Sequence, residues 1–280
     1  MFFDFSPKRF SYKLKLFDFQ NANDCFPTVE IKGGVSYFLW DSVYEGDCEV
    51  TTNEGSGEKS TITRPLIEDG METFIRNGKL ISLLYKVKSL GEDSFADIVS
   101  ANDPFGYDTR EEHSSKRVKV PFTLKKSEES IPFYYNGWRN DGIGYVDKSS
   151  VKRNKESASK YKVFIPKAWG IGNPSKDWLN PFIPLDNAVC TETYLMVGPF
   201  NTLEEAENCM GYIQTKFFHI MVSFIKSTQN TMQKAYAAVP MQDFNEVWTD
   251  EKLYAKYGFT DEEITYIESS IRPQDSNGND

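Results

Sequence analysis

The alternation of apolar and polar residues predicts two strands near the start of the chain. Residues Tyr12 to Phe19 (YKLKLFDF) alternate between polar and apolar positions, as in a strand with one buried face. Residues Gly34 to Trp40 (GVSYFLW) are almost all apolar, as in a strand inside a sheet that is covered on both faces. No earlier strand or helix is predicted that could build such a sheet, so the chain is expected to start in the middle of a domain.

Further along, the pattern predicts a mixture of helices and strands. From Ile67 to Leu90 apolar residues recur at helical spacing, which predicts a long packed helix with a kink at Gly78. Thr202 is followed three residues later by Glu205, a capping box that opens a helix, and a second apolar helix ends near Ile225. Further strands are expected at 118–122, Ile131 to Tyr135, Tyr161 to Ile165 and Thr193 to Val197.

Two short helices are expected to close the fold. Thr249 and Thr260 each precede a run of acidic residues, which is typical of a helix N-terminus, and Gly258 between them is a helix stop. The loop composition of residues 51–60 (TTNEGSGEKS) marks the first domain boundary. The predicted fold class is mixed α/β. Its predicted divisions are 1–60, a main domain at 61–244, and a helical extension with a frayed tail at 245–280.

Composition narrows the class of protein. The 280 residues are 39% hydrophobic and 26% charged, so the chain can bury a core. Its four cysteines are far apart, and with only two histidines present they predict neither a disulfide scaffold nor a zinc site. No apolar run approaches the roughly 20 residues that span a bilayer, and no signal peptide is visible. A cytoplasmic protein without membrane contact is therefore expected.

Charge is distributed unevenly along the chain. The net charge is −9, which argues against a general polyanion binder. Residues Lys148 to Lys176, however, contain eight basic residues and one acidic residue, whereas Asp243 to Asp280 contain three basic and ten acidic ones. The basic segment suits contact with a phosphate backbone on one face of the molecule. The alternative is a solvated loop whose lysines only keep it soluble.

Aromatic residues lie within the basic segment and just before it. Tyr135, Trp138 and Trp169 could stack on bases beside these cations, and packing in the core is the alternative for Trp169. Gly170 to Gly172 allow a close backbone approach but lack the third glycine and the following helix of a dinucleotide-binding loop. The aromatic residues therefore favour nucleic-acid contact, while the signal for a nucleotide cofactor is weak.

Candidate catalytic groups are few. The two histidines are expected to be structural, because His219 sits among apolar residues and His113 follows two glutamates in a polar loop. Glu30 and Lys32 are spaced as in one half of a metal-dependent nuclease motif, for which Asp18 or Asp24 would be the upstream carboxylate. A metal-dependent nuclease is thus an open alternative. The chain contains no P-loop, HExxH or GxSxG motif.

Five short motifs, taken in order, resemble those of a known family. They are Cys25 to Trp40 (CFPTVEIKGGVSYFLW), Asp103 to Gly106 (DPFG), Lys162 to Gly170 (KVFIPKAWG), Thr191 to Tyr194 (TETY) and Val239 to Phe244 (VPMQDF). Together they resemble the C-terminal half of restriction–modification adenine-specific DNA methyltransferases, which include the TaqI-like and type IIG enzymes. The resemblance covers most of residues 12–272.

The resemblance implies an architecture and a function. Lys13 to Phe19 and Val35 to Trp40 would be the last strands of a Rossmann-like catalytic sheet, and residues from Ile62 onward would form an α/β target-recognition domain. In the family, the catalytic domain binds S-adenosylmethionine, and an Asn-Pro-Pro-Tyr/Phe motif holds a flipped adenine. This chain has no such motif. We therefore expect no cofactor in this chain, and S-adenosylmethionine only in an enzyme completed by a separate catalytic methyltransferase half.

A DNA-reading surface needs cations for phosphates and planar donors for base edges. Arg139 and Asn140 supply such donors on a glycine-bounded loop beside Trp138. The predicted contacts with double-stranded DNA are Tyr135, Trp138, Arg139, Asn140, Lys148, Lys152, Arg153, Lys155, Lys167, Trp169, Asn173, Lys176, Gln229, Asn230 and Lys234. The predicted function is sequence-specific DNA recognition without methyl transfer by the chain alone. The alternatives are the nuclease and a non-enzymatic subunit that pairs through an exposed sheet edge.

Overall fold

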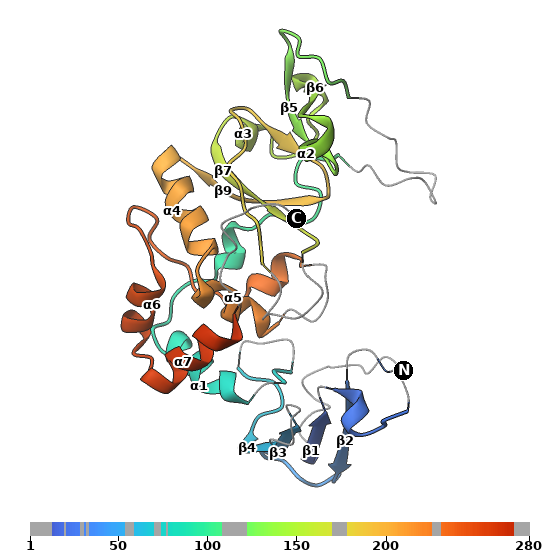
Figure 1. Cartoon of the computed structure of the whole chain (residues 1–280), viewed down its shortest axis with the longest axis vertical. Coiled ribbons are helices and arrows are strands. Elements are labelled where there is room, and N and C mark those ends of the chain that lie inside the picture. The colour runs from blue at the N-terminus through green and yellow to red at the C-terminus, as the bar shows by residue number, and fades with distance from the viewer. Residues whose placement is uncertain are drawn as a thin grey trace. The chain divides into compact units, whose positions relative to one another are not determined.

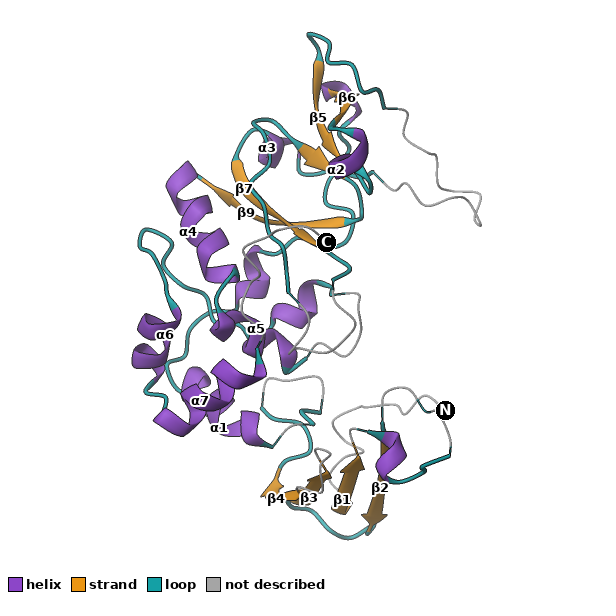
Figure 2. Cartoon of the chain, in the orientation of Figure 1, coloured by secondary structure: helices purple, strands orange, loops and turns teal. Residues whose placement is uncertain are grey.

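The chain folds into a mixed α/β structure, which confirms the predicted fold class (Figures 1 and 2). It divides into two compact units, Met1–Ser89 (unit 1) and Leu90–Asp280 (unit 2), and each is described by itself. The structure is a computed structural model. It describes residues 13–19, 21–28, 31, 34–53, 59–69, 74–76, 78–107, 122–169, 178–225 and 231–271.

Unit 1 contains a four-stranded sheet in the order β2-β1-β3-β4. Both strands predicted near the start of the chain are confirmed. Strand β1 pairs antiparallel with β2 and parallel with β3, and β3 pairs antiparallel with β4. Leu16, Cys48 and Val50 form the small core under this sheet, together with Leu66. The elements are β1 (Lys13–Phe19), η2 (Ala22–Asp24), β2 (Val35–Trp40), β3 (Cys48–Asn53), β4 (Lys59–Arg64) and α1 (Lys79–Lys88).

Strand β2 lies at the edge of the described sheet and its side chains are exposed, so the expectation of a buried strand inside a sheet covered on both faces is wrong. Among the described residues of unit 1, its strand neighbour is β1. Tyr37, Leu39 and Trp40 are 51%, 53% and 57% exposed. The aromatic and aliphatic composition of β2 suits a covered strand, but the described residues of unit 1 do not provide the cover.

The segment 51–60, expected to be a loop at a domain boundary, is partly sheet. Residues 51–53 belong to β3 and residues 59–60 to β4, and the Thr51 and Thr61 hydroxyl oxygens lie 2.9 Å apart across the two strands. Threonine is favoured in strands because its branched side chain packs well on a pleated surface. The two compact units divide after Ser89, and the predicted domain boundary stays a prediction.

The prediction of a long helix from Ile67 to Leu90 is also wrong for the first part of this range. Helix α1 covers Lys79–Lys88, and Gly78 precedes it as the N-cap residue rather than forming a kink. The described residues 65–69 and 74–76 are not helical. Two arginines hold this segment: Arg64 pairs with Glu68 at 2.9 Å, and Arg76 binds Asp18 through two contacts of 2.8 Å. Charge-assisted bonds of this kind outweigh a weak helical pattern.

Unit 2 contains a three-stranded sheet, β6-β5-β8, and a two-stranded sheet, β7-β9. The strands predicted at Ile131 to Tyr135, Tyr161 to Ile165 and Thr193 to Val197 are confirmed by β5, β7 and β9, whereas 118–121 lie outside the described residues. The elements are η3 (Phe95–Ile98), β5 (Ser130–Tyr134), α2 (Trp138–Asp141), β6 (Gly144–Asp147), η4 (Lys148–Ser150), α3 (Lys155–Ala158), β7 (Tyr161–Pro166), β8 (Val189–Cys190), β9 (Tyr194–Phe200), α4 (Leu203–Ile213), α5 (Lys216–Ser223), η5 (Gln233–Tyr236), α6 (Asp250–Tyr257) and α7 (Asp261–Ser270).

The C-terminal helices begin where their capping residues predict. Thr202 and Glu205 form the expected capping box of α4. Thr249 caps α6 and Thr260 caps α7, and Gly258 ends α6 in the left-handed conformation. Capping is a local interaction between neighbours in sequence, so it can be predicted without knowledge of the tertiary fold.

The described residues bear on the expectations about disulfides, metal ligands and membrane-spanning segments. All four cysteines are free, and Cys48, Cys190 and Cys209 are buried. No group of three or more potential metal ligands occurs in the described part of the chain. Among the helices described there, none combines the length and apolar character needed to cross a bilayer.

Asp250 links helices α5 and α6. It is the first residue of α6, and its carboxylate accepts backbone N–H bonds from Lys216 at 3.1 Å and Phe217 at 2.8 Å, at the start of α5. Burial raises the pKa of Asp250, although the two N–H bonds act in the opposite direction. The side chain thus satisfies two helix donors that would otherwise be left without acceptors.

We predict that Asp250→Ala lowers the free energy of unfolding by about 1 to 3 kcal/mol, because two buried N–H groups lose their acceptor. Urea denaturation followed by circular dichroism measures the effect. Asp261→Ala is the matched control, since Asp261 is an exposed acid in the first turn of α7. Equal destabilisation by the two substitutions would contradict the capping role of Asp250.

Candidate nucleic-acid interface

A short helical loop connects β5 to β6 and carries the first group of predicted contacts. Helix α2 lies in this connection between the two strands of the hairpin (Figure 1). Gly137 before it and Gly142 after it have φ values of 102° and 94°, which residues other than glycine rarely adopt. The Tyr135 hydroxyl donates to the Gly142 carbonyl oxygen at 3.1 Å and closes the loop. The ring of Tyr135 is buried, so Tyr135 stabilises the loop from the interior and does not present its ring to solvent.

Trp138 joins this loop to the core of unit 2. Its indole Nε1 donates to the Tyr194 hydroxyl at 2.9 Å. The ring centroid lies 4.9 Å from that of Tyr134 and 5.3 Å from that of Phe182. Trp138 is half-buried, so it acts mainly as an anchor, with part of its surface reaching solvent.

Arg139 and Asn140 point their polar groups toward solvent from the same loop. Both residues are exposed. The guanidinium carbon of Arg139 lies 5.0 Å from the Trp138 ring centroid and 5.8 Å from that of Phe182, within the range of cation–π attraction. The loop therefore presents an arginine fork and a carboxamide, the two groups that pair bidentately with base edges.

The turn at Asp103–Gly106 holds the basic segment in place. The Phe105 carbonyl oxygen accepts N–H bonds from Lys152 at 3.2 Å and Arg153 at 3.4 Å. Asn154 Nδ2 donates to the Pro104 carbonyl oxygen at 2.7 Å, and Arg153 pairs loosely with Asp103 at 3.5 Å. A Cβ on Gly106, whose φ is 86°, would lie 2.8 Å from the Lys152 Cβ, so the two backbones approach as closely as glycine permits.

The cations from Lys148 to Lys160 lie on the surface. They are Lys148, Lys152, Arg153, Lys155 and Lys160, all exposed, with Glu156 as the single acid in this stretch. The segment follows β6 directly, so α2 and the first of these cations lie at opposite ends of a four-residue strand. One hairpin thus carries planar donors at one end and positive charge at the other.

Two further lysines of the predicted basic surface behave differently. Lys162 is buried, 2% exposed, and its ammonium donates to the carbonyl oxygens of Ala158 and Lys160, both at 2.8 Å. Burial lowers its pKa to about 8. Lys167 is half-buried and donates to Asn102 Oδ1 at 3.2 Å. Lys162 therefore caps the C-terminal end of α3 and is not part of the exposed positive surface.

Trp169 lies in the interior, beside the buried His219. Trp169 is 8% exposed and meets the His219 ring edge-on, with centroids 5.7 Å apart. Trp178 stacks on His219 at 4.1 Å, and His219 Nε2 accepts the Leu179 N–H at 3.1 Å. This geometry fits the structural role expected for the histidine and leaves little of the Trp169 ring for a base.

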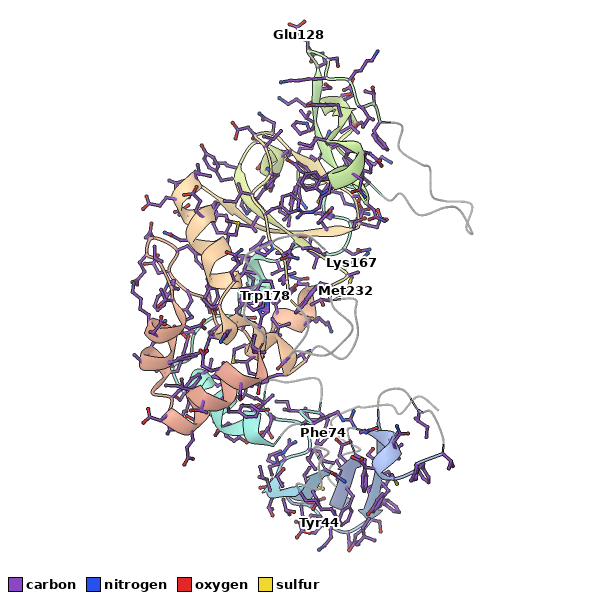
Figure 3. All side chains as sticks on the ribbon, viewed as in Figure 1. Tyr44, Phe74, Glu128, Lys167, Trp178 and Met232 are labelled. Atoms are coloured by element: carbon purple, nitrogen blue, oxygen red, sulfur yellow. The ribbon has the colours of Figure 1, made fainter. Side chains whose placement is uncertain are left out.

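The last group of predicted contacts lies within residues 226–230 and just after them in the sequence. The Thr231 N–H donates to the Lys167 carbonyl oxygen at 2.8 Å, which brings the two segments side by side near Met232 (Figure 3). Lys234 is exposed in η5. The predicted contacts outside the described residues are Asn173, Lys176, Gln229 and Asn230, and they stay predictions.

Sequence reasoning missed the residues that position the contacts. Tyr194 and Phe182 hold Trp138 and Arg139, and Asp103 and Phe105 hold the basic segment. Tyr194, Asp103 and Phe105 lie in the motifs TETY and DPFG, so the motif strings were the available signal. Their spacing in sequence does not show which residues meet in the fold.

Of the residues proposed for a nuclease site, only Asp18 and Asp24, the two alternatives for the upstream carboxylate, lie in the described part of the chain. Asp18 is buried, 3% exposed, and is bound by Arg76, while Asp24 is in η2 on the surface. Glu30 and Lys32 lie outside the described residues. The nuclease alternative therefore stays a prediction that no contact among the described residues of unit 1 favours.

Comparison with known proteins gives short or distant similarities. No family model matches the chain. A stretch of 43 residues, 15% of this chain, is 44% identical to 10% of an uncharacterised adenine-specific methylase of Mycoplasma pneumoniae. Two solved structures align with most of the chain, the type IIG restriction endonuclease BpuSI and the type IIL restriction–modification enzyme MmeI in complex with DNA.

The structural alignments are distant. For BpuSI the TM-score is 0.34 with 11% identity, covering 90% of this chain and 39% of that protein. For MmeI the TM-score is 0.36 with 8% identity, covering 81% of this chain and 34% of that protein. Scores this low carry no conclusion about fold or function. All three matched proteins are, by their names, methylase, restriction or restriction–modification proteins, and the matches span well under half of each.

We predict that the buried amine of Lys162 makes stability depend on pH. Its folded pKa of about 8 lies below the ordinary 10.5, so between these values the unfolded chain binds more protons, and the contribution of Lys162 to stability rises with pH. The unfolding free energy of the wild type minus that of Lys162→Met should grow by about 1 to 3 kcal/mol across this window. Urea denaturation at pH 7.5 and pH 10 measures it.

Lys160→Met controls for loss of one positive charge, because the Lys160 side chain is exposed. If the difference between wild type and Lys162→Met stayed constant over the window, burial would not lower the pKa of Lys162 and the prediction would be wrong.

Proposed function

We propose that unit 2 is a DNA target-recognition module. The observation that carries the proposal is the β5–α2–β6 hairpin, which ends in the exposed Arg139 and Asn140 and runs on into the exposed cations Lys148, Lys152 and Arg153. Cations bind phosphates and fix the position of a protein on DNA, whereas planar donors read base edges. The hairpin and the segment that follows it carry both kinds of group.

The charge pattern supports contact with a polyanion despite the net charge of −9. The acidic residues gather in the C-terminal helices, where Asp250, Glu251 and the acids of α7 occupy first turns and favour helix formation. The exposed cations gather after β6. Because electrostatic attraction is screened within about 10 Å at ordinary salt, the local charge matters more than the total.

The enzyme system that this module would serve is an adenine-specific restriction–modification methyltransferase. The 43-residue similarity to an adenine-specific methylase supports this assignment, as do the sequence motifs. The chain has no Asn-Pro-Pro-Tyr/Phe motif, so we assign the binding of S-adenosylmethionine and the methyl transfer to a separate catalytic half. In this proposal the chain contributes recognition and no chemistry of its own.

We predict that reversing three charges, Lys152→Glu, Arg153→Glu and Lys155→Glu together, weakens binding to duplex DNA at least tenfold. The slope of log K against log salt should also become shallower, by about 0.9 for each phosphate that the variant no longer neutralises. A fluorescence anisotropy titration at several salt concentrations measures both. Lys252→Glu in acidic α6 is the control, and it should change neither. An unchanged slope in the triple variant would remove this segment from the interface.

A second candidate function is a subunit that self-associates through β2. The exposed edge strand favours it, with Tyr37, Phe38, Leu39 and Trp40 between 41% and 57% exposed and Val43 83% exposed. These side chains expose on the order of 100 Å² each, or about 1,000 Å² in total for two copies, close to the lower limit for a stable interface. Residues 35–40 carry no charge, so two copies could pair antiparallel without repulsion.

The second function predicts a concentration-dependent dimer without DNA affinity. Size-exclusion chromatography with light scattering measures its mass, and Leu39→Lys should convert it to a monomer because a charged edge resists pairing. Thr63→Lys, on the exposed face of β4 at the other edge, is the matched control. A monomer at every concentration would refute this second function and leave DNA recognition unaffected.

A further inference from the structure

We infer that Arg139 reads a guanine in the DNA target and thereby determines specificity. This inference rests on the proposed recognition function. It adds the identity of the base and assigns the reading to one side chain, held ready before DNA arrives by Trp138 and Phe182.

The position of the guanidinium group is the first argument. Its carbon lies 5.0 Å from the Trp138 ring and 5.8 Å from the Phe182 ring, so aromatic surface holds it on one side. Arg139 is exposed, and no carboxylate among the described residues forms an ion pair with it. Its N–H donors therefore remain available for a ligand in solvent.

The surroundings favour a base edge over a phosphate. Within α2 the positive charge of Arg139 is balanced by Asp141, and the exposed amides nearby are Asn140 in the helix and Asn136 just before its N-cap. Phosphates are bound where cations gather, and here the cations gather at the far end of β6. An arginine among amides, away from that cluster, suits the reading of hydrogen-bonding patterns.

The chemistry of the fork selects the base. In the major groove, guanine offers O6 and N7 as two adjacent acceptors, which match two parallel N–H groups of arginine. Adenine offers one acceptor and one donor, which match asparagine instead, and Asn140 is the neighbour that could read it. A good bidentate pair discriminates against a wrong base by about tenfold to a hundredfold.

Rigidity of the loop strengthens the inference. Gly137 and Gly142 permit the turn, Tyr135 closes it, and the Nε1 bond to Tyr194 anchors Trp138. A donor that is already in place loses little entropy on binding, so more of its hydrogen-bond energy goes into discrimination. An arginine on a loose loop would add general affinity but little specificity.

The test is selection from a random duplex library with the wild-type chain and with Arg139→Gln, followed by sequencing of bound DNA. The wild type should enrich a motif that contains guanine. Arg139→Gln should lose the preference at one guanine position and keep the others. Lys155→Gln is the matched control, because removal of a phosphate-binding cation should lower affinity about equally for every sequence.

A second measurement uses 7-deazaguanine, which lacks the N7 acceptor, at the assigned position. It should weaken wild-type binding at least tenfold and leave Arg139→Gln unaffected. Equal loss of affinity for all sequences in Arg139→Gln, or no loss, would overturn the inference while leaving DNA recognition intact. Absence of any DNA binding by the wild type at low salt would instead refute the proposed function itself.

Discussion

The hydrogen bond from the Trp138 indole N–H to the Tyr194 hydroxyl is the interaction on which the proposed DNA-reading surface depends. It joins the α2 loop to the first residue of β9, in the core of unit 2. Burial raises the pKa of Tyr194, so its hydroxyl stays protonated and uncharged through the neutral range. The ring of Trp138 in turn contacts the guanidinium group of Arg139. Without this bond the loop would keep its glycines but lose the fixed aromatic surface beneath the arginine.

Much of the fold could be predicted from the sequence wherever the signal was local. The helices that begin at Thr202, Thr249 and Thr260 were predicted because capping depends on neighbours in sequence. The helix expected from residue 67 was wrong because Arg64 and Arg76 bind partners that the periodicity of apolar residues does not reveal. For β2 the sequence showed an apolar strand, but burial depends on which elements come to lie beside it, and that is a property of the tertiary structure.

The candidate site, like the fold, could be predicted from the sequence only in part. Exposed cations between Lys148 and Lys160 could be predicted, because charged side chains rarely leave the surface. Lys162 is the exception, since two carbonyl oxygens hold its ammonium inside. Tyr135 and Trp169 carry the same aromatic signal as Trp138, yet both are buried and only Trp138 lies partly open. An aromatic residue beside cations can stack on a base or pack in the core, and its sequence neighbours do not decide between them.

The central claim is that DNA meets the hairpin of α2 and the basic segment that follows it. Amide hydrogen exchange of the chain, measured with and without a DNA duplex at low salt, tests this most directly. We expect slower exchange on DNA binding that is concentrated in residues 136–155, with little change in α6 and α7. Slower exchange confined to α6 and α7, or no change anywhere, would contradict it.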